Sequence, residues 1–260
     1  MVRILRVDCG QPRHPRYGVL DDDLDTVRLL HGEPFGELDL SGQVTTLSES
    51  PALVPVTPTK VLAVGRNYAR HAEEMGLVLG EVPSVFLKPP QSLLAHGGDV
   101  ILPPPDVSGR VEHEAELAVV IGRTARNVRA ADAFDHILGF TCADDVSARD
   151  LQRGDPQLTR GKGFDTFCPL GMAIETDVRA DTDYEITCKV NGEERQRATT
   201  AELIYSIPFL VEWLSAWTTL VPGDVVLTGS PAGTGPLAAG DCVEIAVTGL
   251  SRLRHGVVSI

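Results

Sequence analysis

The sequence lacks the features that mark secreted, membrane-spanning and nucleic-acid-binding proteins. Its five cysteines are widely scattered and form no C-x-x-C pair, which argues against a disulfide framework and a thiolate zinc site. No apolar run approaches the roughly 20 residues that cross a bilayer. The net charge of −13 is spread along the chain, and so acidic a surface repels phosphate backbones and anionic lipids. We therefore expect a cytoplasmic protein with reduced thiols that binds neither nucleic acid nor membranes.

Common targeting and catalytic motifs are missing as well. Residues 1–7 form too short an apolar stretch for a signal peptide and instead predict a β-strand. There is no G-x-S-x-G nucleophile elbow. The small-residue loop at 228–235 lacks the G-K-[ST] ending of a P-loop and the dinucleotide-binding fingerprint. These absences argue against serine-nucleophile and nucleotide chemistry.

A chain of 260 residues is long enough for one substantial domain and a small addition. Residues 1–40 alternate short apolar stretches with turns rich in glycine, proline and aspartate, which predicts a small β-rich segment. Pro51, Pro55 and Pro58 then exclude a helix and indicate a connection. We place the boundary near residue 55, so that residues 1–55 form a small N-terminal domain and residues 56–260 a larger one.

The larger region contains more predicted strands than helices. Apolar runs and Gly-Asp turns predict strands at 61–64, 117–121 and 137–142 and strand starts at Gly98, Gly223 and Gly240. Helices are predicted at 68–75, ended by Gly76, and between 202 and 217, with Pro208 near the start. Because no regular βαβ series is present, we predict a mixed, strand-dominated α+β fold.

An acidic cluster borders two of the predicted buried strands. Glu114 and Glu116 point to the same face of a strand, about 7 Å apart. Such paired carboxylates cost free energy unless a hard divalent cation lies between them, and Asp145 at the end of the next strand offers a third ligand. The alternatives are an exposed acidic strand face and, for Asp145, a helix N-cap. Ser147 and Asp150 resemble a capping pattern that starts a helix.

Three further segments carry candidate catalytic or binding groups. His71 and Glu74 share a helix face, and a carboxylate bonded to one imidazole nitrogen orients the other as a general base. Lys162, flanked by glycines in a predicted loop, is suited to bind a carboxylate or a developing negative charge. The loop around Ser230 offers backbone N–H groups to an anion. The alternatives are a surface His/Glu pair, a solvated lysine and a flexible turn.

Six segments, in this order, resemble the fumarylacetoacetate hydrolase family. They are G-R-N-Y-A-R-H-A-E-E-M-G, F-L-K-P-P, H-E-A-E-L-A-V-V-I-G, D-V-S-A-R-D-L-Q, R-G-K-G-F-D-T-F-C-P-L-G and P-G-D-V-V-L-T-G-S-P-A-G-T-G. Together they cover residues 60–260. The resemblance implies a rolled-sheet catalytic domain of the family's C-terminal type, preceded by a small β-rich N-terminal domain, and a homodimer.

The resemblance also implies roles for individual residues. Glu114, Glu116 and Asp145 would hold Mg²⁺ or Mn²⁺. The implied catalytic residues are His71, Glu74 and Lys162, and the implied substrate-binding residues are Arg66, Gln152 and Ser230. Four positions depart from the family pattern. Asp144 stands where asparagine is common and Ser230 where threonine is usual, while Gly163 and Met172 replace a frequent serine and proline and are expected to alter the loop around Lys162.

We interpret the chain as a divalent-metal-dependent hydrolase that cleaves a C–C bond in an acylpyruvate or a related 1,3-dicarbonyl oxo-acid. The family substrates that the resemblance implies are acylpyruvates, oxaloacetate-like acids and hydroxy-dienedioates from aromatic catabolism. One alternative is an isomerase or decarboxylase of 2-hydroxyhepta-2,4-diene-1,7-dioate or oxaloacetate-type acids. A second is a non-catalytic metal- or metabolite-binding protein. The segment between Gly76 and Pro83 has a composition that makes a mobile lid plausible.

Overall fold

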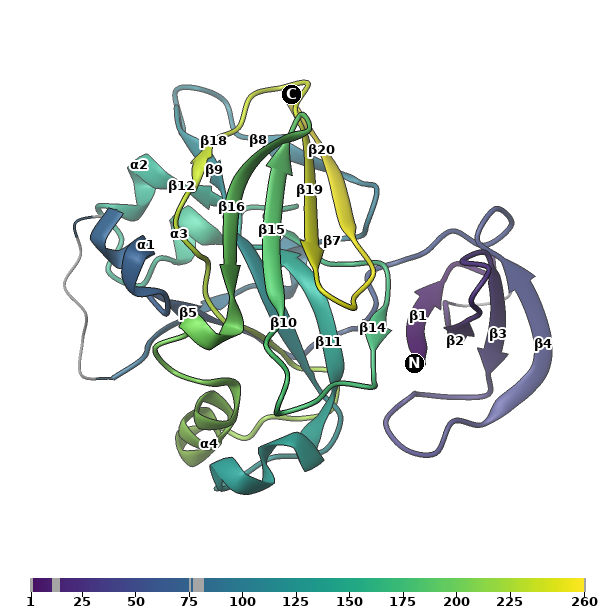
Figure 1. Ribbon diagram of the computed structural model, residues 1–260. Helices are drawn as coiled ribbons and strands as arrows, with labels where there is room; N and C mark the ends of the chain where they lie inside the picture. Colours follow the sequence, from purple (N-terminus) through teal and green to yellow (C-terminus); the bar gives the residue numbers. More distant parts are fainter. Residues whose placement is uncertain (1, 11–14, 75, 77–81, 260) are drawn as a thin grey trace.

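Strands dominate the structure, as the sequence predicts. The computed structural model describes residues 2–10, 15–74, 76 and 82–259. Figure 1 shows a large part that contains the helices and a smaller part formed by the first four strands. The α+β prediction is therefore confirmed. Residues 77–81 of the predicted lid lie outside the described part of the chain.

The largest sheet of the described residues runs through both parts. Its strand order is β4-β3-β2-β1-β14-β11-β10-β17-β5-β6. Its first half comprises β1 (Arg3–Val7), β2 (Arg16–Leu20), β3 (Thr26–Leu30), β4 (Leu40–Thr46) and β14 (Ile174–Glu175). Its second half comprises β11 (Ile137–Asp144), β10 (Ala115–Ile121), β17 (Val225–Leu227), β5 (Val61–Gly65) and β6 (Ser84–Lys88).

The N-terminal strands form an antiparallel meander that joins this sheet along a short edge. Strand β1 pairs with β14 only where Arg3 faces Glu175 and Ile4 faces Ile174. An Asp-rich turn precedes β3, and the Asp23 carboxylate accepts hydrogen bonds from the backbone N–H groups of Asp25 and Thr26. The β-rich character of this segment is thus confirmed, while the domain boundary near residue 55 stays a prediction.

A second sheet packs against the first and encloses the main core. Its order is β16-β15-β19-β20-β8, with β16 (Glu193–Thr199), β15 (Glu185–Val190), β19 (Cys242–Val247), β20 (Leu253–Ser259) and β8 (Asp99–Leu102). Leu117 and Val119 of β10 share one apolar cluster with Ile186 of β15 and Ile245 of β19. Apolar side chains of the two sheets therefore face each other, which is the usual way two sheets form a core.

Further short elements lie outside these two large sheets. They are β7 (Leu93–Leu94), β9 (Val111–His113), β12 (Ser147–Ala148), β13 (Cys168–Pro169), β18 (Gly235–Pro236), η1 (Pro90–Ser92), η2 (Ala130–His136), α1 (Ala69–Glu74), α2 (Arg149–Gln152) and α3 (Thr159–Lys162). Gly76 follows α1 with a φ of +64°, which fits the predicted helix end. The three Gly-Asp turns lead into β8, β17 and β19, as predicted.

The long amphipathic helix begins later than predicted. Residues 200–202 form a separate turn, η3 (Thr200–Glu202), closed by a capping box with Thr199. Helix α4 (Ile207–Trp217) then starts after Ser206, whose hydroxyl accepts a hydrogen bond from the backbone N–H of Phe209. Two successive N-terminal caps thus divide the predicted segment.

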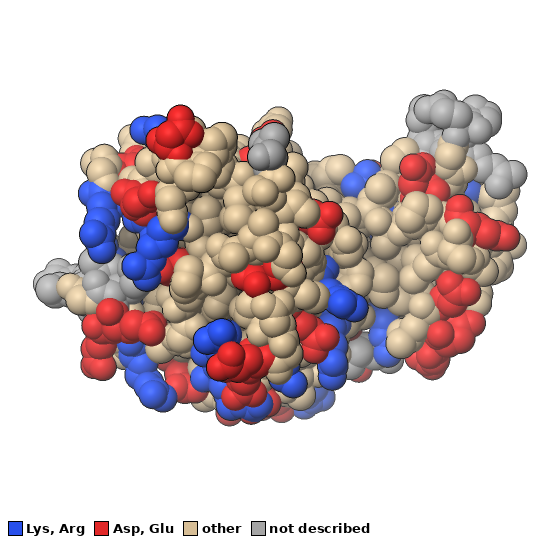
Figure 2. All heavy atoms as spheres, turned by 90° about the horizontal axis from the view of Figure 1, so that it is seen from above, with Lys and Arg blue, Asp and Glu red and all other residues tan. Residues whose placement is uncertain are grey.

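Charged side chains are spread over the surface (Figure 2), and the cysteines form no disulfide. Figure 2 shows acidic and basic side chains interspersed over the larger part, with acidic ones prominent on the N-terminal part. All five cysteines are free thiols. Within the described ranges, no helix is both long and apolar enough to cross a membrane.

Candidate active site

The floor of the candidate site is an antiparallel ladder between β10 and β11. Ala115 faces Asp144 across the ladder, and Glu116 faces Ala143. The ladder continues beyond the strands, because the backbone N–H of Asp145 donates to the carbonyl oxygen of Glu114 at 2.9 Å. Residues distant in sequence therefore reach the same end of the sheet with a fixed register.

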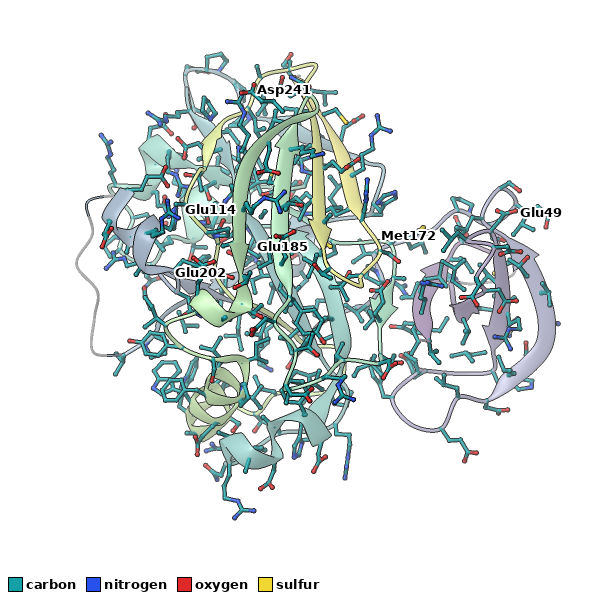
Figure 3. The ribbon with its side chains drawn as sticks, in the orientation of Figure 1. Glu49, Glu114, Met172, Glu185, Glu202 and Asp241 are labelled. Carbon is teal, nitrogen blue, oxygen red and sulfur yellow. The ribbon has the colours of Figure 1, made fainter. Side chains whose placement is uncertain are left out.

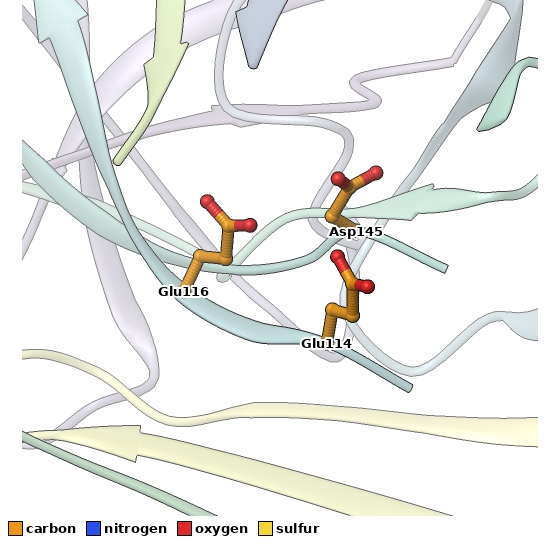
Figure 4. Close-up of side chains that lie close together, drawn as sticks. All are labelled: Glu114, Glu116 and Asp145. Atoms are coloured by element: carbon orange, nitrogen blue, oxygen red, sulfur yellow. The ribbon is translucent and has the colours of Figure 1, made fainter. Parts of the chain in front are cut away.

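The three predicted metal-ligand carboxylates converge at this end. Glu114, Glu116 and Asp145 are buried, and each offers an oxygen within 4.8 Å of an oxygen of the other two. Figure 4 shows Glu114 and Glu116 side by side, with Asp145 opposite them. The exposed-strand alternative is wrong for these residues, since all three side chains are shielded from solvent.

Buried cations balance two of these carboxylates. Lys162 Nζ donates to Glu114 Oε2 and to Asp145 Oδ2, both at 2.6 Å. Lys88 Nζ donates to Asp145 Oδ1 at 2.5 Å, and Arg149 pairs with Glu114. Burial alone would raise the pKa of Glu114, but Lys162 and Arg149 outweigh burial and hold it well below its usual range.

Glu116 has no comparable cation. Its Oε2 accepts a hydrogen bond from the backbone N–H of Gly229 at 2.6 Å, and no ion pair among the described residues includes it. Burial, together with the negative charges of Asp145 and Glu114, raises its pKa well above the usual value. A hard divalent cation among three carboxylate oxygens would remove this repulsion, so the residues present fit Mg²⁺ or Mn²⁺.

The predicted general base lies beside this cluster. His71 on α1 places Nδ1 3.4 Å from Glu74 Oε2 and Nε2 3.9 Å from Glu114 Oε1. Asn67 anchors the start of this short helix, because its side-chain amide donates to the carbonyl oxygens of Tyr205 and Thr228. His71 therefore faces the carboxylate cluster and belongs to the site, and the surface-pair alternative is wrong for it.

All nine predicted site residues line one cavity of about 440 Å³. Arg66, Gln152 and Ser230 form part of its wall. Three further arginines, and a glutamate that pairs with two of them, also line it. These four are Arg110, Glu112, Arg149 and Arg153. Figure 3 shows the side chains that surround Glu114, between α1 and β16. The cavity thus combines an acidic floor with a wall rich in arginine.

Comparison with known proteins identifies this arrangement. Residues 60–258 match the family described as fumarylacetoacetate (FAA) hydrolase C-terminal, and residues 2–53 match the Rv2993c-like N-terminal family. The chain belongs to the fumarylacetoacetate hydrolase family. The family prediction made from the six segments is therefore confirmed.

Relatives within the fumarylacetoacetate hydrolase family carry different activity names. The chain is 42% identical over 205 residues to oxaloacetate tautomerase FAHD1 of Arabidopsis thaliana, covering 76% of this chain and 91% of the relative. A solved 5-carboxymethyl-2-hydroxymuconate delta-isomerase from Mycobacterium smegmatis is 42% identical, with a TM-score of 0.91 and coverage of 99% and 100%. A fumarylpyruvate hydrolase from Pseudomonas aeruginosa, solved with Mn²⁺ and pyruvate, is 32% identical, with a TM-score of 0.73 and coverage of 89% and 94%. The prediction that the chain is an enzyme of this family is confirmed.

Two expectations about the wall of this family member are wrong. Ser147 does not cap a helix, because it lies in β12 and its hydroxyl donates to the carbonyl oxygen of Asp145. Helix α2 starts after Ala148 without a side-chain cap. Lys162 is not in a loop, because it is the last residue of α3. Its ammonium group is buried 5.2 Å from the centre of the Phe86 ring. The solvated-lysine alternative therefore fails too.

The loop at 228–235 donates its N–H groups to carboxylates of the protein itself. Gly229 N–H donates to Glu116, and Gly233 N–H donates to Glu74 Oε2 at 3.0 Å. Both glycines have positive φ angles, +106° and +99°. This loop therefore ties a predicted metal ligand and a predicted catalytic residue to one backbone segment, and the flexible-turn alternative does not describe it.

The departures from the family pattern have separate structural consequences. Asp144 Oδ1 accepts a hydrogen bond from the Glu114 backbone N–H at 2.7 Å, and its Oδ2 lies 2.9 Å from His255 Nε2. A Cβ at Gly163 would lie 2.5 Å from the Thr159 carbonyl oxygen, so a serine here would require the backbone to shift. Met172 packs with Leu5 and the N-terminal strands, and Figure 3 shows it far from Glu114, to which Lys162 donates. This corrects the expectation that Met172 alters the loop around Lys162.

Lys88 and Arg149 are the main site residues that the sequence analysis missed. Each lies within a quoted segment, F-L-K-P-P or D-V-S-A-R-D-L-Q, but neither was singled out. A signal for Lys88 exists in β6, where Phe86 and Lys88 are buried and Leu87 between them is exposed. A lysine in the buried phase of a strand requires a carboxylate partner, which Asp145 provides.

Proposed function

We propose that this protein is a divalent-metal-dependent isomerase or tautomerase, which moves a proton beside the keto group of a small anionic oxo-acid. The supporting observation is the position of His71, whose Nε2 lies 3.9 Å from a carboxylate oxygen of the three-carboxylate cluster. A proton acceptor and a cation site thus share one cavity. Proton transfer next to a carbonyl group needs both.

Glu114, Glu116 and Asp145 would hold the cation. When bound there, Mg²⁺ or Mn²⁺ would draw electron density from the keto oxygen of the substrate and make the neighbouring C–H bond more acidic. Three protein carboxylates leave coordination positions open for a small ligand. The donor set consists of hard oxygens, which favours these ions over softer ones.

The arginine-rich wall accounts for an anionic substrate. Arg66, Arg110, Arg149 and Arg153 line the cavity with Lys162. Arg149 and Lys162 already pair with Glu114, and Arg110 pairs with Glu112. Guanidinium groups bind carboxylates through paired N–H donors. We assign Gln152, which accepts a hydrogen bond from Arg149 at 2.7 Å, to the substrate-facing wall beside them.

His71 and Glu74 would handle the proton. The Glu74 carboxylate accepts a hydrogen bond from Nδ1–H of His71, which leaves the Nε2 lone pair directed toward the cluster. His71 would take a proton from the carbon next to the keto group and return it to another atom of the same conjugated system. Lys162, held by two carboxylates, would stabilise the negative charge that develops meanwhile.

Hydrolysis of a C–C bond in an acylpyruvate is the second candidate. The His71–Glu74 pair is equally suited to take a proton from water, and a cavity of about 440 Å³ holds a small oxo-acid together with water. Oxaloacetate-type decarboxylation would use the same groups. The reaction therefore has to be separated by experiment.

The test uses purified protein that has been stripped with EDTA and reloaded with Mn²⁺. Interconversion of the keto and enol forms of oxaloacetate is followed by ultraviolet absorbance, and release of pyruvate and acetate from acetylpyruvate is followed by NMR. Faster keto–enol conversion that EDTA abolishes supports the tautomerase. Pyruvate and acetate release alone would replace it by the hydrolase, and oxalate binding without any turnover would leave a binding protein.

Two features implied by the resemblance also remain proposals. We expect a homodimer, which light scattering coupled to size-exclusion chromatography measures directly. A single species with the mass of one 27.9 kDa chain would contradict it. A boundary near residue 55 would be visible as preferential proteolysis of the connection around Pro55.

A further inference from the structure

Gln196 is a buried amide in an otherwise exposed part of an edge strand. It lies on β16, where residues 193–195 and Arg197 are exposed, yet only 1% of Gln196 is accessible. Its Oε1 accepts from the Ala115 backbone N–H at 3.0 Å and faces His113 Nδ1 at 2.9 Å. Its Nε2 donates to Ser230 Oγ at 2.8 Å and to the Pro231 carbonyl oxygen at 2.7 Å. All four hydrogen-bonding positions of the amide are therefore used.

These partners allow only one orientation of the amide. The Ala115 backbone N–H is a donor and the Pro231 carbonyl oxygen is an acceptor, so an inverted amide would face a donor with its NH₂ group and an acceptor with its oxygen. The same reasoning places a proton on His113 Nδ1, because Oε1 of Gln196 only accepts. The orientation thus follows from groups whose hydrogen-bonding roles are known.

The orientation of Gln196 determines the role of Ser230. Because Nε2–H of Gln196 occupies a lone pair of Ser230 Oγ, the serine proton must be donated elsewhere. The nearest recorded acceptor, the carbonyl oxygen of Pro231, is 3.5 Å away and already accepts from Gln196 at 2.7 Å. Ser230 lines the cavity, so its O–H is available to a ligand there.

We propose that Gln196 is a positioning residue that makes Ser230 a hydrogen-bond donor to an oxygen of the substrate. Through Ala115, which lies between Glu114 and Glu116, it also ties the same loop to the strand that carries two predicted metal ligands. This inference rests on the proposed function, since it assigns Ser230 to an oxygen of the oxo-acid. Gln196 itself does not line the cavity that contains the metal-ligand carboxylates.

The decisive variant is Gln196→Glu. A carboxylate keeps the acceptor for Ala115 and His113 but presents a second acceptor to Ser230, which would then donate its proton to residue 196. Affinity for oxalate is measured by calorimetry on Mn²⁺-loaded protein, beside Ser230→Ala and the double variant. We expect each single variant to bind oxalate about tenfold more weakly, because a hydrogen bond to a charged group is lost, and the double variant to lose no more.

Several outcomes would overturn the inference. Losses that multiply in the double variant would show that Gln196 acts independently of Ser230, and unchanged oxalate affinity in Ser230→Ala would show that Ser230 does not donate. Where Gln196→Glu fails to fold by circular dichroism, Gln196→Met, of similar length and uncharged, replaces it in the same cycle. Ser230→Thr keeps the hydroxyl and should retain affinity.

The oxalate measurement also separates this inference from the proposed function. Wild-type protein that binds oxalate with Mn²⁺ but converts no oxo-acid would contradict the proposed reaction and still allow the cycle to be completed. If turnover is found, we expect Gln196→Glu to raise KM for oxaloacetate about tenfold with kcat changed less than about threefold. A variant that lowers kcat alone would contradict a role in holding the ligand.

Discussion

Replacing Glu116 by glutamine should raise the free energy of unfolding of the metal-free protein. In the presence of a divalent cation it should lower that free energy relative to the wild type. Glu116 is 1% exposed, and one of its oxygens lies within 4.8 Å of oxygens of Glu114 and Asp145. At a pH above its raised pKa, where Glu116 is ionised, two like charges at that distance repel by about 3 kcal/mol at an effective dielectric constant of about 20. Because Lys162 offsets part of this repulsion, we expect Glu116→Gln to stabilise the metal-free protein by about 1–2 kcal/mol.

With a bound cation, the wild type should be more stable than Glu116→Gln. At a Mn²⁺ concentration about 100 times its dissociation constant, binding stabilises a folded protein by about 2.7 kcal/mol. For a chain of this size that corresponds to a rise in Tm of about 5–10 °C. Glu116→Gln removes one charged ligand, so its Tm should rise by less than about 2 °C on the same addition.

The assay is differential scanning calorimetry of EDTA-stripped protein before and after addition of Mn²⁺. Glu49→Gln is a matched control, because Glu49 is exposed on the N-terminal part, far from Glu114 (Figure 3). The control should follow the wild type in both conditions. A Glu116→Gln variant that melts below the wild type without metal, or that keeps the full shift with Mn²⁺, would refute the assignment of Glu116 as a ligand.

Three further outcomes follow from the structure. His71→Ala should lower kcat by about 10²–10⁴-fold with Mn²⁺ affinity unchanged, and a loss below about tenfold in a steady-state assay would remove His71 as the base. Gly229→Ala should unfold at a lower urea concentration than Gly240→Ala. Both glycines have strongly positive φ angles, but only a Cβ at residue 229 would clash, because it would lie 2.7 Å from Asn67 Cβ. Equal losses of unfolding free energy in the two variants would contradict this. Burial raises the pKa of Glu175, so its contribution to stability is fully present below its unfolded pKa and is lost as pH rises through the folded pKa. Glu175→Gln should therefore raise Tm at pH 8 but not at pH 4, and a pH-independent effect would contradict the reasoning.

The sheet framework and its carboxylates were predictable because their signals are local. A continuous apolar run in β10 predicts a buried strand, and period-two alternation places Glu114 and Glu116 on one face. The end of the next apolar run supplies Asp145. Antiparallel pairing of two successive strands then brings the three residues together, as the register between β10 and β11 shows.

The sequence predicted Lys162 as a site residue, but not its helix, its ion pairs or the supporting roles of Arg149 and Gln196. Arg149 and Lys162 lie on helices of four residues, α2 and α3, which are too short to carry a periodic signal. Leu158 precedes α3 with a φ of +61°. Leucine rarely adopts this left-handed conformation, so the sequence gives no signal for it. Gln196 reaches Ser230, which lies in the loop after β17 of the large sheet, from β16 of the second sheet, so its role depends on the packing of the two sheets.

The start of α4 shows another limit of sequence patterns. The apolar spacing that predicts a helix between 202 and 217 includes Leu203, which packs at the edge of the main core although it is not helical. Apolar residues at helical spacing therefore do not distinguish a helix from a turn that packs against the same surface. The caps at Thr199 and Ser206 carry the information that locates the boundary.

The contrast between the floor and the wall of the cavity has a consequence for how new specificities arise. The floor is a hydrogen-bonded ladder within the large sheet, where a change of register would displace every side chain at once. Besides β9, much of the wall consists of three helices of four to six residues and of loops, and exposed loop positions tolerate substitution and insertion far better than a ladder does. Apart from the proposed catalytic residues on these helices, His71, Glu74 and Lys162, positions on the wall can therefore change while the carboxylates of the floor are inherited unchanged. Relatives of the same family carry tautomerase, isomerase and hydrolase names, which such a division would allow.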